Sequence, residues 1–101
     1  MIKINYTKEN RNFEFRSKGH ANYDELGKDI VCSAVSSIII GALNAIKDID
    51  SFEIKIKEGD VTVKSIKPVS DYDNVVIETM LIQLQTVESK FKKNLIINKE
   101  K

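Results

Sequence analysis

The sequence of 101 residues contains only one cysteine, Cys32, and only one histidine, His20. A single cysteine excludes an internal disulfide, so the chain is not a small secreted scaffold held together by disulfide bonds. One cysteine and one histidine also fall short of the three or four soft ligands of a thiolate zinc site. One proline and four glycines exclude collagen-like and low-complexity chains. We therefore expect a protein that works without a metal or other cofactor.

The sequence also lacks an excess of charge of either sign, because 16 Lys and Arg residues are balanced by 15 Asp and Glu residues. This balance provides no basic field that would attract nucleic acid directly. The first residues lack the long apolar core of a secretory signal. The apolar stretch at residues 38–40 is interrupted by neighbouring serines and by Asn44, so it falls short of the ~20 apolar residues of a membrane span. We therefore expect a cytoplasmic protein with neither a membrane nor a direct nucleic-acid partner.

Two pairs of segments alternate apolar and polar residues, which is the pattern of half-buried strands. The first pair is residues 2–6 and 13–16, joined by a polar turn. The second pair is residues 52–57 and 61–64, joined by the tight turn Glu58-Gly59-Asp60. Each pair predicts a β-hairpin.

Apolar residues recur at steps of three and four after each hairpin, as on a helix that faces a core. The first helix is predicted to begin after Asp29, whose carboxylate is a good N-cap, and its apolar positions extend to Ile49. Asp71 or Asp73 is expected to cap the second helix. The apolar positions predicted for the second helix are Val76, Met80, Leu84, Val87 and Phe91.

A last short strand is expected at residues 95–97. The resulting order, strand–strand–helix–strand–strand–helix–strand, indicates an α+β fold with two layers. We expect a mostly antiparallel sheet covered by two helices. No linker interrupts the pattern, so residues 1–101 are expected to form a single domain.

Cys32 and His20 are the residues of this chain with the clearest chemical potential. Cys32 falls in the first turn of the first predicted helix, where unpaired amides and the helix dipole favour a thiolate, the nucleophilic form of cysteine. His20 lies twelve residues earlier, at the end of a predicted strand. A strand end and the next helix start can approach each other while the polar segment between them loops out. The two residues are therefore candidates for the thiolate–imidazolium pair of a cysteine hydrolase.

Two further residues near Cys32 each have a structural and a chemical interpretation. Asp29 is a helix cap, and its charge would oppose a thiolate unless His20 carried a proton nearby. Ser36 lies one turn beyond Cys32 on the same helix face, where its hydroxyl either bonds near the sulfur or satisfies a carbonyl of its own helix. Cys32 itself has an alternative interpretation, because single cysteines in apolar helices are often buried and inert.

The strings Gly19-His20-Ala21 and Gly-Lys-Asp-Ile-Val-Cys-Ser-Ala-Val-Ser at residues 27–36 resemble the signature of the ribosomal-processing cysteine proteases. The resemblance lies in the Gly-His-Ala triplet, the His-to-Cys spacing and the Asp-Ile-Val-Cys helix start. Chain length and element order agree, so it extends over essentially the whole domain. Ser33 stands where the family more usually has alanine.

The resemblance implies that Cys32 is the nucleophile and His20 the general acid/base, with supporting roles for Asp29 and Ser36. Members of the family are small homodimers that remove a short N-terminal extension from large-subunit ribosomal protein twenty-seven. Because the cleaved sequence carries aromatic residues before the scissile bond, an apolar cleft is expected beside Cys32. The polar segment 22–28, with Gly27, is expected to be a mobile loop that closes over substrate. The amides at the helix start are expected to hold the oxyanion.

Exposed apolar helix flanks are the expected dimer surface, because a chain of this length buries only part of its surface. The candidates are Ile40 and Leu43 on the first helix and Ile77 and Ile82 on the second, unless these flanks pack within their own chain. The competing function is a non-enzymatic, ribosome-associated interaction module with a buried, inert Cys32. A thiol redox sensor is disfavoured because it needs a second, resolving cysteine.

Overall fold

Five strands form one mixed sheet in the computed structural model, which describes residues 1–25 and 28–100. The strands are β1 (Ile2–Glu9), β2 (Asn12–Lys18), β3 (Phe52–Lys57), β4 (Asp60–Ser65) and β5 (Leu95–Lys99). Their order across the sheet is β3-β4-β2-β1-β5. Neighbouring strands are antiparallel except β1 and β5, which run parallel. The mostly antiparallel α+β sheet predicted from the sequence is therefore confirmed.

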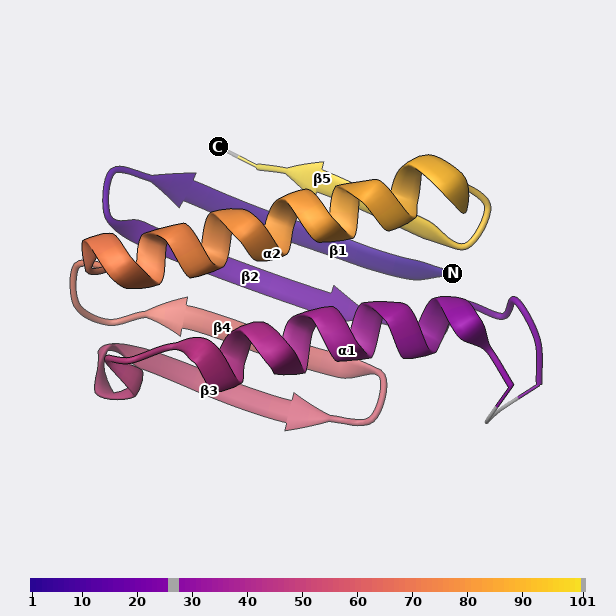
Figure 1. The fold of residues 1–101 in the computed structure, drawn as a ribbon, viewed down its shortest axis with the longest axis horizontal. Helices are drawn as coiled ribbons and strands as arrows, with labels where there is room; N and C mark the ends of the chain where they lie inside the picture. The colour runs from indigo at the N-terminus through magenta and orange to yellow at the C-terminus, as the bar shows by residue number, and fades with distance from the viewer. Residues whose placement is uncertain (26–27, 101) are drawn as a thin grey trace.

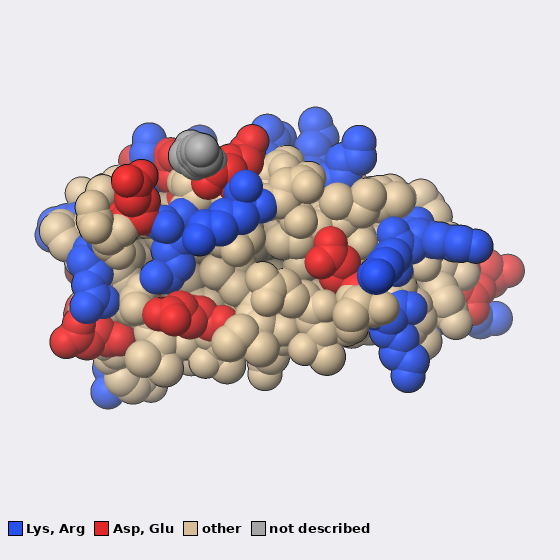
Figure 2. Space-filling view, turned by 90° about the horizontal axis from the view of Figure 1, so that it is seen from above, with Lys and Arg blue, Asp and Glu red and all other residues tan. Residues whose placement is uncertain are grey.

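Two helices, α1 (Ile30–Ala45) and α2 (Asp71–Lys90), lie side by side on one face of this sheet (Figure 1). The other face of the sheet carries the polar residues of the alternating strands. On the side of the molecule shown in Figure 2, acidic and basic side chains are interspersed. Neither described helix is long and apolar enough to cross a membrane.

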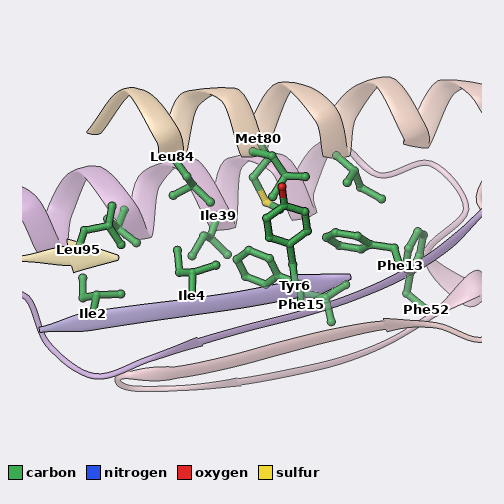
Figure 3. Close-up of a cluster of buried hydrophobic side chains, with 14 of the residues drawn as sticks. Ile2, Ile4, Tyr6, Phe13, Phe15, Ile39, Phe52, Met80, Leu84 and Leu95 are labelled. Carbon is green, nitrogen blue, oxygen red and sulfur yellow. The ribbon is translucent and has the colours of Figure 1, made fainter. Parts of the chain in front are cut away.

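The core fills the space between the helices and the sheet (Figure 3). It is built from alternate residues of the strands and from one stripe of each helix, because side chains repeat every second position on a strand and every third or fourth on a helix. The buried residues include Ile2, Ile4, Tyr6, Phe13 and Phe15 from the first hairpin, Val31, Val35 and Ile39 from α1, and Ile77, Met80, Leu81 and Leu84 from α2.

The predicted ends of two elements were wrong, and in both cases Asp73 is involved. Helix α1 stops at Ala45, and Ile49 lies in a separate 3₁₀ turn, η1 (Ile49–Ser51). The N–H groups of Lys47 and Asp48 bond to the buried carboxylate of Asp73 instead of continuing the helix. Neither Asp71 nor Asp73 caps α2: the cap is Ser70, whose hydroxyl accepts the N–H of Asp73.

The proposed dimer flanks also need correction. Ile77 is only 3% exposed and belongs to the core, so it is not a surface flank. Ile40 and Leu43 are half-buried. Ile82, by contrast, is 62% exposed on the outer face of α2. The predicted apolar stripe of α2 is confirmed in part: Met80 and Leu84 are buried, and Val87 and Phe91 pack against the core. The prediction missed Ile77 and Leu81, which are buried, whereas Val76 is only half-buried.

Candidate active site

The candidate site lies at the end of the molecule where α1 begins, on the right in Figure 1. His20 follows the end of β2, and Cys32 lies in the first turn of α1. The turn between β3 and β4 reaches the same end and joins the end of β2 through a hydrogen bond of 2.8 Å from the N–H of Gly19 to the carbonyl oxygen of Gly59.

Asp29 ties the start of α1 to the segment that precedes it. Its Oδ1 accepts the N–H groups of Val31 and Cys32 at 3.0 and 2.9 Å. Its Oδ2 accepts those of Tyr23 and Asp24 at 2.9 and 3.4 Å. Burial raises the pKa of Asp29, but these backbone hydrogen bonds together outweigh burial and hold the pKa below its ordinary value. Asp29 is therefore a charged carboxylate, and its predicted role as the cap of α1 is confirmed.

The thiol of Cys32 is half-buried and faces the backbone that follows His20. Its Sγ accepts the N–H of Ala21 at 3.2 Å. The carbonyl oxygen of Ala21 in turn accepts the side-chain N–H of Asn94 at 3.0 Å. The peptide next to His20 is thus held directly against the sulfur.

The imidazole of His20 is exposed and rests on the β3–β4 turn. A Cβ atom placed on Gly59 would lie 2.9 Å from Nε2 of His20, closer than real Cβ contacts. Gly59 also has a φ of +72°, which lies in the left-handed region that favours glycine. The sequence indicated a tight turn at Gly59, but no sequence signal indicated that this glycine makes room for the histidine ring.

Two surface clefts meet at the candidate site. Both are lined by His20, Cys32, Ser36 and Glu58. The polar cleft, of about 640 Å³, is also lined by Asn22, Asp24, Asp29, Ser33 and Ser37. The apolar cleft, of about 370 Å³, lies between α1 and the second hairpin, and its apolar walls include Ile2, Val35, Ile39, Ile40, Ile56 and Val61.

The structure therefore brings together at one cleft the four residues that the sequence singled out, but they do not all line the second cleft. His20, Cys32 and Ser36 line both clefts, whereas Asp29 lines only the polar one. The apolar cleft expected beside Cys32 is present. Gly27 and part of the predicted loop lie outside the described residues, so the expected loop closure stays a prediction. Among residues 1–25 and 28–100, no three His, Cys, Asp or Glu side chains are placed to hold a metal ion.

Three amides of the helix start, which was expected to hold the oxyanion, already have acceptors in the structure. The amides of Val31 and Cys32 already donate to Asp29, and the amide of Ser33 donates to the carbonyl oxygen of Asp29. A capping carboxylate uses the same unpaired amides that an oxyanion would need. These amides are therefore occupied, and the N–H that contacts the sulfur comes from Ala21.

A half-buried thiol at a helix start and an exposed imidazole line the same two clefts, and this arrangement is typical of a cysteine hydrolase. The family model described as "Cysteine protease Prp" matches residues 1–96. The chain belongs to the cysteine protease Prp family, and it is a cysteine protease, as the resemblance of its sequence motifs implied.

Relatives and solved structures agree with this family. The ribosomal processing cysteine protease Prp of Staphylococcus aureus is 33% identical over 84 residues, which cover 79% of each chain. The protein of the same name from Mycoplasma genitalium is 34% identical over 102 residues, covering 99% of this chain and 97% of the relative. A crystal structure of the S. aureus protease with a covalently linked product peptide superimposes with a TM-score of 0.89 at 29% identity, covering 99% of this chain and 100% of that one.

Replacing Asp29 by Asn is expected to lower the free energy of unfolding by about 1–3 kcal/mol. The side-chain amide of Asn has an NH2 group in place of one carboxylate oxygen, so two backbone N–H groups lose their acceptor and face another donor. The folded pKa of Asp29 lies below its ordinary value of 3.8, so its contribution to stability is complete above pH 3.8 and is lost as the pH falls through the folded pKa. Urea denaturation of wild type and Asp29→Asn at neutral and acidic pH measures the free energy of unfolding of each protein.

The stability gap between wild type and Asp29→Asn should narrow at acidic pH. Asp50→Asn, at an exposed aspartate of η1, is the matched control and should leave stability nearly unchanged. A gap that stays constant down to the lowest pH would contradict the assignment of a charged, hydrogen-bonded Asp29.

Proposed function

We propose that this protein is an endopeptidase that removes a short N-terminal extension from large-subunit ribosomal protein twenty-seven, with Cys32 as nucleophile and His20 as general acid/base. The observation that carries the proposal is that both residues line the same two clefts while Cys32 Sγ is held by the neighbouring Ala21 amide. The names of the relatives, ribosomal processing cysteine proteases, support a ribosomal substrate. A solved S. aureus relative, 28% identical, binds a substrate peptide.

The reaction follows from the chemistry of a thiolate next to an imidazolium. The sulfur attacks the carbonyl carbon of the scissile peptide, so a C–S bond forms and the carbonyl electron pair moves to oxygen. When the C–N bond breaks, His20 gives its proton to the leaving amine. The neutral imidazole then takes a proton from a water molecule, whose oxygen attacks the carbonyl carbon of the thioester. The C–S bond breaks, which releases the acid and regenerates the Cys32 thiolate and the imidazolium.

Asp29 and Ser36 support this reaction in different ways. Both oxygens of Asp29 are used by backbone amides, so we assign it a positioning role at the helix start. Its capping bonds set the direction of the first turn of α1 and so the position of Cys32. Ser36 is exposed and lines both clefts, so it is the one of the two placed to contact a bound peptide.

The apolar cleft supports a substrate with an aromatic or aliphatic residue before the scissile bond, as the family resemblance implies. Ile40 of α1 and Ile56 of β3 are two of its lining residues. Burial of an apolar side chain there contributes binding energy in proportion to the apolar area removed from water. Ile56 is 56% exposed, which leaves it free to contact a peptide.

Cys32→Ala is expected to abolish cleavage of a peptide that spans the extension, because no other thiol exists in the chain. His20→Ala should lower kcat by about 10²–10⁴-fold, the usual contribution of a general acid/base. Peptide cleavage followed by chromatography measures both effects, and thermal unfolding of each variant is the control for folding.

Iodoacetamide separates this function from the interaction module that the sequence left open. An accessible thiolate is alkylated rapidly near neutral pH, whereas a buried, inert thiol is not. Continued cleavage by Cys32→Ala, or a Cys32 that resists alkylation in the folded protein, would overturn the proposed mechanism.

Ile56→Glu is expected to lower kcat/KM by about tenfold for a peptide with an aromatic residue before the scissile bond, because a charge then occupies an apolar wall. Ile66→Glu is the matched control: Ile66 is 53% exposed and is not among the residues that line the cleft. Equal losses in the two variants would contradict a binding role for the apolar cleft.

We also propose that the protein is a homodimer that uses the outer face of α2. Val75 and Ile82 are separated by two helical turns and are 63% and 62% exposed, so they share an exposed apolar face. A second copy of the chain would remove this face from water.

Light scattering is expected to give twice the mass of the chain at micromolar concentration. Ile82→Lys should shift the protein toward monomer, whereas Ile49→Lys, at a 49% exposed isoleucine of η1, should not. A monomeric wild type would exclude the dimer.

A further inference from the structure

The turn between α2 and β5 contacts the backbone beside the candidate nucleophile. Asn94 lies in this turn, where its N–H donates to the carbonyl oxygen of Phe91 at 2.9 Å. Its half-buried side chain donates to the carbonyl oxygen of Ala21 at 3.0 Å, across a separation of 73 residues. Phe91 adds a second contact, because the ring of Tyr23 meets it edge-on at 5.4 Å between centroids. The segment that follows His20 is thus held by the far end of the chain.

Ala21 is the residue through which this contact reaches the sulfur. It is 1% exposed, and its N–H donates to Cys32 Sγ at 3.2 Å. The amides of Val31 and Cys32 are bonded to Asp29 and do not compete for this role. A donor whose acceptor is itself a reacting atom can change partner during the reaction, whereas a donor bonded to a buried carboxylate keeps its partner.

We propose that Asn94 is a positioning residue of this protease: it fixes Ala21 so that the Ala21 N–H stabilises first the sulfur and then the oxyanion. This inference rests on the proposed role of Cys32 as nucleophile. Asn94 holds the carbonyl side of Ala21, and the N–H lies on the other side of the same Cα. Restraining the carbonyl therefore limits rotation of the residue and keeps the N–H directed at the site.

The charge moves in a way that suits a single shared donor. When the sulfur forms its bond to carbon, its negative charge disappears and the carbonyl electron pair becomes the charge on oxygen. The negatively charged sulfur that accepted the Ala21 N–H is thus lost as an acceptor in the same step that creates a negatively charged oxygen, which can accept the N–H in its place. When the tetrahedral intermediate collapses, the C–N bond breaks and His20 protonates the amine. A preorganised N–H at this position lowers the barrier because it needs no reorganisation during the reaction.

Asn94→Ala and Asn94→Asp test this inference in the full-length protein. Both remove the donor to the Ala21 carbonyl, and Asp replaces it with an acceptor of almost the same shape. We expect kcat to fall by about ten- to a hundredfold, toward the loss seen when an oxyanion donor is removed, while KM stays within about twofold. The rate of Cys32 alkylation by iodoacetamide should fall as well, because the sulfur loses its aligned donor. Asn94→His, which retains an N–H donor, should recover part of both rates.

Asn98→Ala is the matched control, because Asn98 of β5 also donates from its side chain, to Asn5 at 3.3 Å on the exposed sheet. It should leave kcat and alkylation unchanged. In an NMR spectrum, the Ala21 amide signal should move in Asn94→Asp and stay in place in Asn98→Ala.

The inference is overturned if folded Asn94→Asp keeps kcat and alkylation within about twofold of wild type. It is also overturned if kcat and the rate of Cys32 alkylation fall only in proportion to the loss of folded protein, because such a result means that Asn94 has a purely structural role. If Asn94→Ala and Asn94→Asp do not fold, a fully active Asn94→Leu or a fully inactive but folded Asn94→His would equally overturn it. A failure of the proposed function is seen separately, as cleavage by Cys32→Ala.

Discussion

The carboxylate of Asp29 is the interaction on which the rest of the site depends. One oxygen accepts hydrogen bonds from two backbone N–H groups in the first turn of α1. The other accepts hydrogen bonds from two backbone N–H groups of the preceding segment. The same side chain therefore starts the helix that carries Cys32 and holds the loop that leads away from His20. Its charge is unfavourable for a neighbouring thiolate. The Ala21 N–H, which donates to the sulfur, acts in the opposite direction, so the local electrostatics depend on several groups acting together.

The site sits where strands end because the chain is free there to leave the sheet and present side chains. Three segments meet at this end of the molecule: the residues that follow β2, the β3–β4 turn and the α2–β5 turn (Figure 1). The pairing of β2 with β4 places Lys18 opposite Asp60, which brings Gly59 to His20. The parallel pairing of β5 with β1 places Leu95 opposite Ile2, which brings Asn94 to Ala21. Sheet register thus controls the geometry of the reacting groups.

Several errors of the sequence analysis have one physical origin. Ser and Asp are almost equally good helix caps, so residues 70–73 offered several starts for α2. The choice was made by packing: Asp73 is buried and bonds the amides that follow α1, which leaves Ser70 as the cap. The sequence correctly placed Ile77 in a helix but did not predict which face of the helix it occupies. A shift of one position turns a side chain by about 100° around the helix axis. Such errors arise wherever a residue's partner lies far away along the chain.

The sequence by itself determined the element order and the cap of α1, because these depend on periodicity and on residues within a few positions of one another. Only the tertiary structure decided which amides Asp29 occupies, which glycine accommodates the histidine ring, where the apolar cleft runs and that Asn94 reaches Ala21. These contacts join segments up to 73 residues apart. No local pattern encodes them, since they arise only when strand register and helix packing are complete.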